Sequence, residues 1–177
     1  ISVIRSWTEL KNNGEEDLGV EYVSSFALLG IDKEGLLSTD EKLEVLIARN
    51  AWQKELIWNR FSMDQLGMSI SQPDKVRRSS QTISVGNTGN WSTKNYLPMG
   101  CLENKETDSI LFWQIEQNGS WYWEISDQDG HMYLQLSGPT EHQSHWWKNL
   151  KPGDTFASVP VSVGSACGDV EEAAGEL

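Results

Sequence analysis

Three short segments of alternating apolar and polar residues between positions 110 and 137 constrain the fold most. They cover residues 110–116, 120–126 and 131–137, and each has the two-residue period of a β-strand. The connectors, Asn118-Gly119 and the Asp-Gln-Asp-Gly run of residues 127–130, have the chemistry of tight hairpin turns. We therefore expect an antiparallel meander of three strands.

The side chains of this meander divide between its two faces. Trp121, Trp123 and Ile125 fall on one face, because successive side chains of a strand point to opposite sides. By the same alternation, Trp113 and Ile115 lie opposite their even-numbered neighbours. A sheet with an apolar face buries it against another layer, so the meander predicts a two-layer protein.

Further short strands and one helix are predicted outside the meander. The strands cover residues 1–11, 20–29, 43–52, 81–85 and 155–163. Residues 56–68 carry apolar side chains at mixed spacing, which favours neither helix nor strand. Residues 169–174 are prone to form a helix, with acidic side chains where the helix dipole favours them. The predicted fold is an all-β antiparallel β-sandwich over residues 1–167, followed by the start of a helix over 168–177.

The charge balance argues against a nucleic-acid partner. The 177 residues include 26 acidic and 14 basic side chains, a net charge of −12, whereas nucleic-acid binders carry basic patches. No apolar run approaches the roughly 20 residues of a membrane-spanning helix, so no membrane partner is expected. The chain begins with Ile1 and resembles a piece of a longer protein. We expect Cys101 and Cys167 to be free thiols, because a core of this size needs no disulfide.

No metal or cofactor is predicted. Asp127 and Asp129 beside a glycine resemble part of a calcium loop, but the spacing is wrong and a hairpin turn is favoured. His142 and His145, with His131 as a third candidate, lie in polar surroundings without the familiar spacing of zinc ligands.

No complete catalytic apparatus is predicted either. The Gly-Ser-Ala-Cys-Gly run of residues 164–168 is not the Gly-x-Ser-x-Gly turn of hydrolases. Glycosidases need two carboxylates across a cleft, and no pair stands out among the many acids of this chain.

Nine tryptophans are the unusual element of the composition. In β proteins tryptophan fills cores or interfaces, or stacks its face on a sugar ring. The adjacent Trp146 and Trp147 form the cluster most typical of a sugar site, and alternation predicts that one of the two points outward. Asn90 and Trp91, in a loop with two glycines, form the second candidate. For each tryptophan, packing in the core or at a domain interface is the favoured interpretation, and a sugar contact is the alternative.

The chain resembles the N-terminal domain of the family 36 glycoside hydrolases, the bacterial α-galactosidases. The segments that carry the resemblance are, in chain order, residues 3–6 with 10–14, Asn50-Ala51-Trp52-Gln53-Lys54-Glu55, the Arg-bearing and Ser-rich residues 76–82, the Leu-Lys-Pro-Gly-Asp turn within residues 147–156, and the acidic residues 168–177. The resemblance begins part-way into the family's domain. Two interpretations follow: the sandwich is complete in this chain, or sheet edges that the family normally covers are exposed in it.

The resemblance implies a sandwich of the supersandwich type that packs on a catalytic (β/α)₈ barrel. In the family, two aspartates of the barrel hydrolyse α-galactosides with retention, and this chain contains neither of them. It would therefore be a non-catalytic domain whose partners are the barrel of the same parent chain, an α-galactoside sugar and further copies of the parent. Candidate contacts with sugar or barrel are Trp91, Asn90, Trp146, Trp147 and Arg78. The family habit and the lack of a disulfide framework favour a cytoplasmic parent.

Two other classes of function stay open at this point. A stand-alone carbohydrate-binding module would use exposed tryptophans and bind sugars without a barrel. A purely structural interaction domain would self-associate through exposed apolar patches, independently of sugar.

Overall fold

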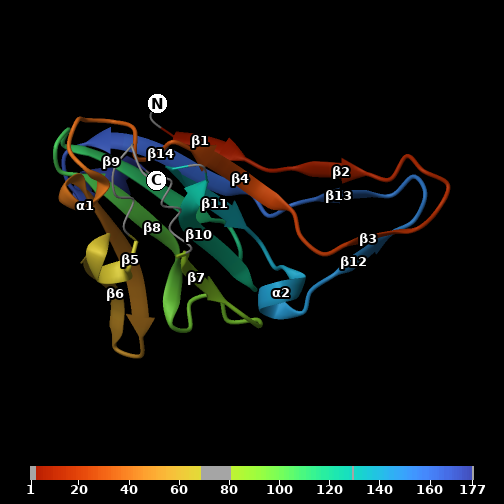
Figure 1. Ribbon diagram of the computed structural model, residues 1–177. Coiled ribbons are helices and arrows are strands. Elements are labelled where there is room, and N and C mark those ends of the chain that lie inside the picture. Colours follow the sequence, from red (N-terminus) through yellow and green to blue (C-terminus); the bar gives the residue numbers. More distant parts are fainter. Residues whose placement is uncertain (1–2, 69–80, 129, 177) are drawn as a thin grey trace.

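Two antiparallel sheets pack against each other, with the main hydrophobic core between them (Figure 1). The structure, a computed structural model, describes residues 3–68, 81–128 and 130–176. The six-stranded sheet has, in spatial order, β1 (Val3–Ser6), β14 (Val161–Cys167), β9 (Ser109–Ile115), β8 (Tyr96–Asn104), β5 (Leu43–Ala51) and β6 (Lys54–Ser62). The four-stranded sheet has β4 (Ser24–Leu29), β11 (His131–Ser137), β10 (Trp121–Gln128) and β7 (Ile83–Asn87). The predicted all-β sandwich is confirmed.

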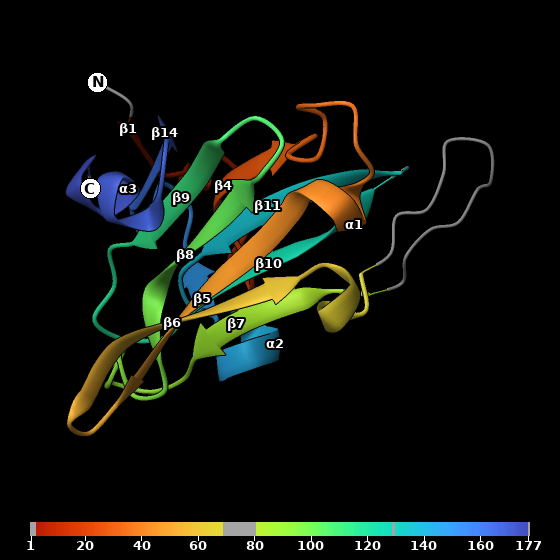
Figure 2. The same ribbon diagram turned by 90° about the vertical axis from the view of Figure 1, so that its left-hand side faces the viewer.

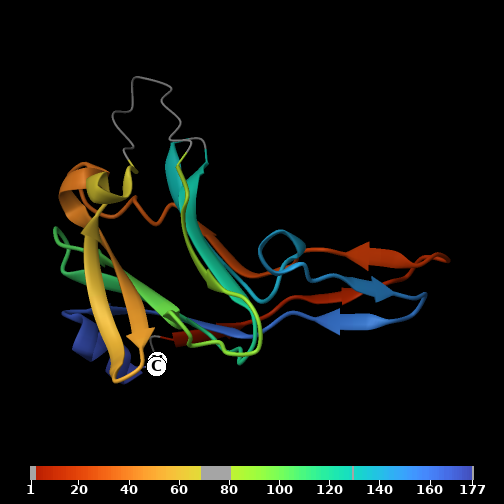
Figure 3. The same ribbon diagram turned by 90° about the horizontal axis from the view of Figure 1, so that it is seen from below.

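A long arm extends from the sandwich (Figures 1 and 3). It is made of two pairs of short strands, β2 (Glu9–Lys11) with β13 (Thr155–Ala157) and β3 (Leu18–Val20) with β12 (Lys148–Leu150). The buried Asn12 ties the arm together, because its side-chain amide donates to the carbonyl oxygens of Glu16 at 2.7 Å and Leu150 at 2.9 Å. The strands predicted over 20–29 and 155–163 are each divided where the chain passes from arm to sandwich.

The core between the sheets is filled by the predicted inward faces. Trp113 and Trp123, one from each sheet, meet edge to face with ring centroids 5.1 Å apart. Trp121 and Ile125 are buried beside them, whereas Tyr122, on the other face of β10, is partly exposed. The two-residue period of this strand therefore decides which side chains enter the core, as predicted.

The predicted hairpin between residues 110–116 and 120–126 is wrong. β9 pairs with β8 and β14 in the six-stranded sheet, while β10 pairs with β7 and β11 in the four-stranded one. The reason is that β9 is apolar on both faces: Trp113 faces the main core, and Ile110 and Phe112 belong to a second buried cluster. Such a strand needs an interior position, so residues 116–120 cross between the sheets. The other predicted pair, β10 with β11, is confirmed up to Gln128 and His131.

β8 was not predicted, because Pro98 and Gly100 are typical strand breakers. Pro98 is tolerated because the ladder between β8 and β5 shifts register there, after Ile47 pairs with Gly100. Gly100 is required because its cross-strand partner Trp113 lies against the backbone. The ambiguous residues 56–68 form most of β6 and a 3-10 turn, η1 (Asp64–Leu66).

Three short helices complete the described chain: α1 (Thr39–Lys42), α2 (Glu141–Ser144) and α3 (Val170–Glu176). The predicted C-terminal helix is confirmed. Asp169 begins α3, since its carboxylate accepts from the backbone N–H groups of Glu171 at 2.9 Å and Glu172 at 3.0 Å. α3 covers the outer face of β9 and β14, and Ala173 closes the second cluster over Phe112 (Figure 2).

Candidate functional site

The β5–β6 hairpin projects from the sandwich (Figures 1 and 2), and its tip carries exposed apolar side chains. Trp52, in the turn, is 87% exposed, and Leu56 and Ile57 of β6 are also exposed. We call these three residues the hairpin tip. Gln53 and Leu56 have φ angles of 59° and 53°, in the left-handed region that disfavours side chains. The tip therefore combines strained backbone with unburied apolar surface, and β6 is the edge of its sheet.

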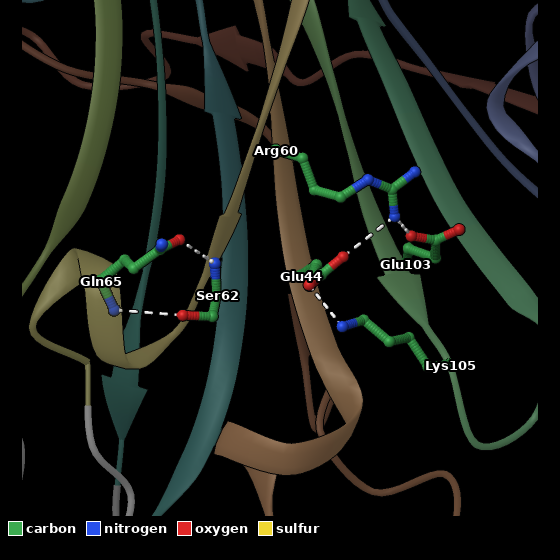
Figure 4. Close-up of polar contacts among 6 residues, drawn as sticks. All are labelled: Glu44, Arg60, Ser62, Gln65, Glu103 and Lys105. Carbon is green, nitrogen blue, oxygen red and sulfur yellow. Dashed lines mark hydrogen bonds and ion pairs between the residues drawn. The ribbon is translucent and has the colours of Figure 1, made fainter.

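An ionic network joins β5, β6 and the end of β8 on the outer face of their sheet (Figure 4). Arg60 forms ion pairs with Glu44, at 3.0 Å, and with Glu103, and Lys105 pairs with Glu44. Glu44 and Glu103 are cross-strand partners, and the two cations offset the repulsion between these like charges. Burial acts to raise the pKa of Glu44, but Lys105 and Arg60 outweigh burial and hold the pKa below its ordinary value. The network therefore links the strands that carry these charges.

Trp146 and Trp147 precede β12, at the base of the arm. Trp146 packs on Phe156 of β13 with ring centroids 5.4 Å apart, and the Lys148 ammonium lies 5.6 Å from the Phe156 centroid. Trp147 is 64% exposed. The expected division into one packed and one exposed ring is therefore found, although both residues lie outside a strand.

Asn90 and Trp91 lie in the loop between β7 and β8, and both are exposed, Trp91 by 58%. Two hydrogen bonds from neighbouring strands hold the backbone of this loop. The side-chain amide of Asn87 donates to the carbonyl oxygen of Trp91 at 2.6 Å, and the indole N–H of Trp121 donates to that of Ser92 at 2.7 Å. The exposed ring is thus carried by an ordered loop.

The candidate contact residues that the structure describes do not lie together in one cluster. Trp146 packs on the arm, whereas the backbone of Trp91 is bonded to Asn87 at the end of β7. Arg78 lies outside the described residues. The hairpin tip was missed, because Trp52 was assigned to a strand and residues 56–68 to no element. The available signal was the consecutive run Leu56-Ile57-Trp58, since an edge strand cannot bury both of its faces.

Within residues 3–68, 81–128 and 130–176, no group of three or more His, Cys, Asp or Glu side chains is placed to hold a metal ion. Among the helices of the described chain, none has the length and apolar character needed to cross a membrane.

No protein-family model and no curated protein matches this sequence. Solved structures do match its fold. The galactosidase domain of the α-galactosidase-sucrose kinase AgaSK superposes with a TM-score of 0.72 at 19% identity, over 94% of this chain and 20% of that one. The same coverage holds for two further enzymes. These are the family 36 α-galactosidase AgaB of Geobacillus stearothermophilus, with a TM-score of 0.73 at 14% identity, and the α-galactosidase of Lactobacillus brevis, with a TM-score of 0.71 at 16% identity.

The chain has the fold of the N-terminal part of family 36 α-galactosidases. At these identities the match defines the family 36 fold and not an activity. The chain spans about a fifth of the length of the enzymes it matches. The family 36 fold therefore extends over nearly all of this chain, and the rest of each matched enzyme has no counterpart in it.

Proposed function

We propose that this chain is a non-catalytic sandwich domain of an α-galactosidase-like glycoside hydrolase. Residues 1–167 form the sandwich, and residues 168–177 are a linker helix toward a (β/α)₈ barrel that hydrolyses α-galactosides with retention. One observation carries the proposal: 94% of this chain matches only 20% of each α-galactosidase chain. A likeness of that kind is typical of one domain of a larger enzyme.

Packing against the barrel is supported by the hairpin tip. Trp52 exposes most of its ring, and Leu56 and Ile57 continue the apolar surface along an unpaired sheet edge. Burial of a tryptophan ring at about 25 cal/mol per Å² over roughly 200 Å² is worth on the order of 5 kcal/mol. A partner that covers the tip would gain most of that free energy and protect the edge.

The proposal of a non-catalytic domain agrees with the four described carboxyl groups whose pKa departs from its ordinary value. Every described carboxyl group with a shifted pKa, namely Glu41, Glu44, Glu106 and Glu116, shifts downward. Hydrogen bonds from neighbouring groups are the cause, and for Glu116 the guanidinium of Arg5 is the largest contribution. The acid/base residue of a glycosidase needs a raised pKa instead.

The experiment compares the chain with its parent protein. The purified 177-residue chain should give no turnover of p-nitrophenyl α-galactoside, whereas the parent should hydrolyse it. In the parent, Trp52→Ala should lower the melting temperature, while the same change at the exposed Trp147 should not. Turnover by a contaminant-free sample of the chain, or equal melting temperatures for the two variants, would contradict the proposal.

A carbohydrate-binding module is the second candidate, because Trp91 and Trp147 are both exposed. Titration of the chain with melibiose and raffinose separates the two functions. A module that uses these rings should bind in the micromolar to millimolar range and lose binding in Trp147→Ala. Light scattering with and without sugar then shows whether the chain self-associates.

The free thiols of Cys101 and Cys167 support a cytoplasmic parent, since thiols stay reduced in that compartment.

A further inference from the structure

A hollow of about 260 Å³ lies on the outer face of the four-stranded sheet. Its lining includes Tyr122 and Glu124 of β10, Gln135 of β11 and Tyr22, with residues 140–143 at and beside α2. Figure 3 shows α2 on the side of this sheet that faces away from the six-stranded sheet. The volume is just below the range of about 300–1,000 Å³ typical of drug-sized ligands, so it suits a single ring.

The floor of the hollow is formed by the side chains of β10 that alternate with its core residues. Trp121 and Trp123 point inward, so Tyr122 and Glu124 point outward. Glu124 and Gln135 are cross-strand partners, so a carboxylate and an amide stand side by side. These two polar groups are thus fixed by a paired ladder and not by a loop.

The walls come from distant parts of the chain and are tied together. The backbone N–H of Glu141, in α2, donates to the carbonyl oxygen of Glu21 at 2.8 Å. That bond fixes the helix beside Tyr22, which is 42% exposed and presents part of its ring to solvent. Thr140 begins α2, and its side-chain oxygen accepts from the backbone N–H of Gln143 at 3.1 Å.

Glu124 is held between two phenols. It accepts from the Tyr122 hydroxyl at 2.5 Å and from the Tyr133 hydroxyl at 2.8 Å. An ionised carboxylate has about four lone-pair sites, so roughly two remain for further donors. Burial, followed by the nearby Glu124, raises the pKa of Tyr22 to about 12, and burial also raises the pKa of Tyr122 and Tyr133. All three phenols are therefore protonated at neutral pH.

A glycine makes room for one of the rings. A Cβ at Gly86 of β7 would lie 2.8 Å from the backbone oxygen of Trp121 and 3.3 Å from Cδ2 of Tyr122. A larger residue at this position would collide with the β10 backbone and would also crowd the Tyr122 ring.

The lining selects against anions. Among the described residues that line the hollow, Glu21, Glu124 and Glu141 contribute carboxylates, His142 is the basic one, and there is no Lys or Arg. The groups on offer are aromatic faces, a carboxylate with free lone pairs and the amide of Gln135. Aromatic faces stack on apolar ring faces, and carboxylates and amides bind hydroxyl groups through strong hydrogen bonds.

We propose that this hollow is a binding site for a neutral hydroxylated ring, that is, a monosaccharide or one unit of a longer sugar. The ring stacks on Tyr22 or Tyr122, and its hydroxyls bond to Glu124 and Gln135. Binding here needs only this chain, without a catalytic barrel and without the exposed tryptophans. It therefore stands or falls separately from the function proposed above.

The test is an NMR titration of the ¹⁵N-labelled 177-residue chain with galactose and, separately, glucose. At least one sugar should bind saturably in the millimolar range, as expected for so small a ligand. The shifted amides should include Tyr22, Glu124, Gln135 and α2. Tyr22→Ala and Gln135→Ala, both at partly exposed positions, should each weaken binding by about fivefold or more.

Two comparisons complete the design. Trp91→Ala and Trp147→Ala should leave the affinity unchanged, and the anionic galacturonate should bind more weakly than galactose. The proposal is overturned if neither neutral sugar binds saturably, if the shifted amides gather around Trp91 or Trp147, or if Tyr22→Ala and Gln135→Ala bind as tightly as the unmodified chain.

Discussion

Gly100→Ala should destabilise the sandwich strongly, because Gly100 stands opposite a tryptophan that cannot move. A Cβ at this position would lie 2.5 Å from Cζ2 and 2.9 Å from Cε2 of Trp113, where ordinary contact begins at 3.4 Å. One of the two groups must therefore shift by about 1 Å. The Trp113 ring is fully buried and meets Trp123 edge to face at 5.1 Å, so it has no free space to enter.

The size of the effect can be worked from the free-energy cost of adding a methyl group to a filled core. Inserting a methyl group into a filled core costs about 1–3 kcal/mol. Replacing any glycine by alanine also stiffens the unfolded chain, which stabilises by about 0.4–1 kcal/mol. Gly19→Ala is the matched control, because a Cβ there meets nothing within 4 Å. The difference between the two variants then isolates the clash with Trp113.

Urea unfolding followed by tryptophan fluorescence measures this difference. We expect the free energy of unfolding of Gly100→Ala to lie about 1–3 kcal/mol below that of Gly19→Ala. For a chain of this size, the melting temperature should be lower by about 2–12 °C. If the two variants differ by less than about 0.5 kcal/mol, the close contact between β8 and the Trp113 ring is not a feature of the folded protein.

Three further predictions test other parts of the structure. At pH 8 a thiol reagent should modify Cys167 quickly and Cys101 only after unfolding, because burial raises the pKa of Cys101 to about 12; equal rates would contradict this. Glu44→Gln should lower stability by about 0.5–1 kcal/mol at pH 7. Since the Glu44 pKa is lowered in the folded state, its contribution should be present above the ordinary glutamate value of 4.5 and fade as the pH falls below it, and a deficit that persists in acid would refute the ionic explanation. Trp123→Ala should cost about 3–5 kcal/mol in urea unfolding and Trp147→Ala less than about 0.5, so similar values would contradict their different burial.

Local patterning was sufficient to predict the faces of the central strands. Trp121, Trp123 and Ile125 occupy the core as their alternation indicates. The pattern did not decide which strands pair, because β9 is apolar on both faces and its partners come from residues far along the chain. β8 escaped prediction since Pro98 and Gly100 argue against a strand unless the register shift and the Trp113 ring are known.

The candidate sites were predictable only where they depend on neighbours in the sequence. The division of Trp146 and Trp147 into a packed and an exposed ring could be foreseen, but the Phe156 partner could not. The outward position of Tyr122 and Glu124 was implicit in the inward position of the tryptophans between them. The wall that Tyr22 and α2 form around them depends on the fold, because those segments lie about a hundred residues apart.

The proposed membership in a larger hydrolase is tested most directly by the coding sequence of the parent on both sides of these 177 residues. We predict several hundred further residues of alternating strand and helix patterns after Leu177, with two aspartates at strand ends where a barrel carries its catalytic groups. A stop codon directly after Leu177, or an unrelated module in its place, would contradict the proposal that this sandwich serves an α-galactosidase-like barrel.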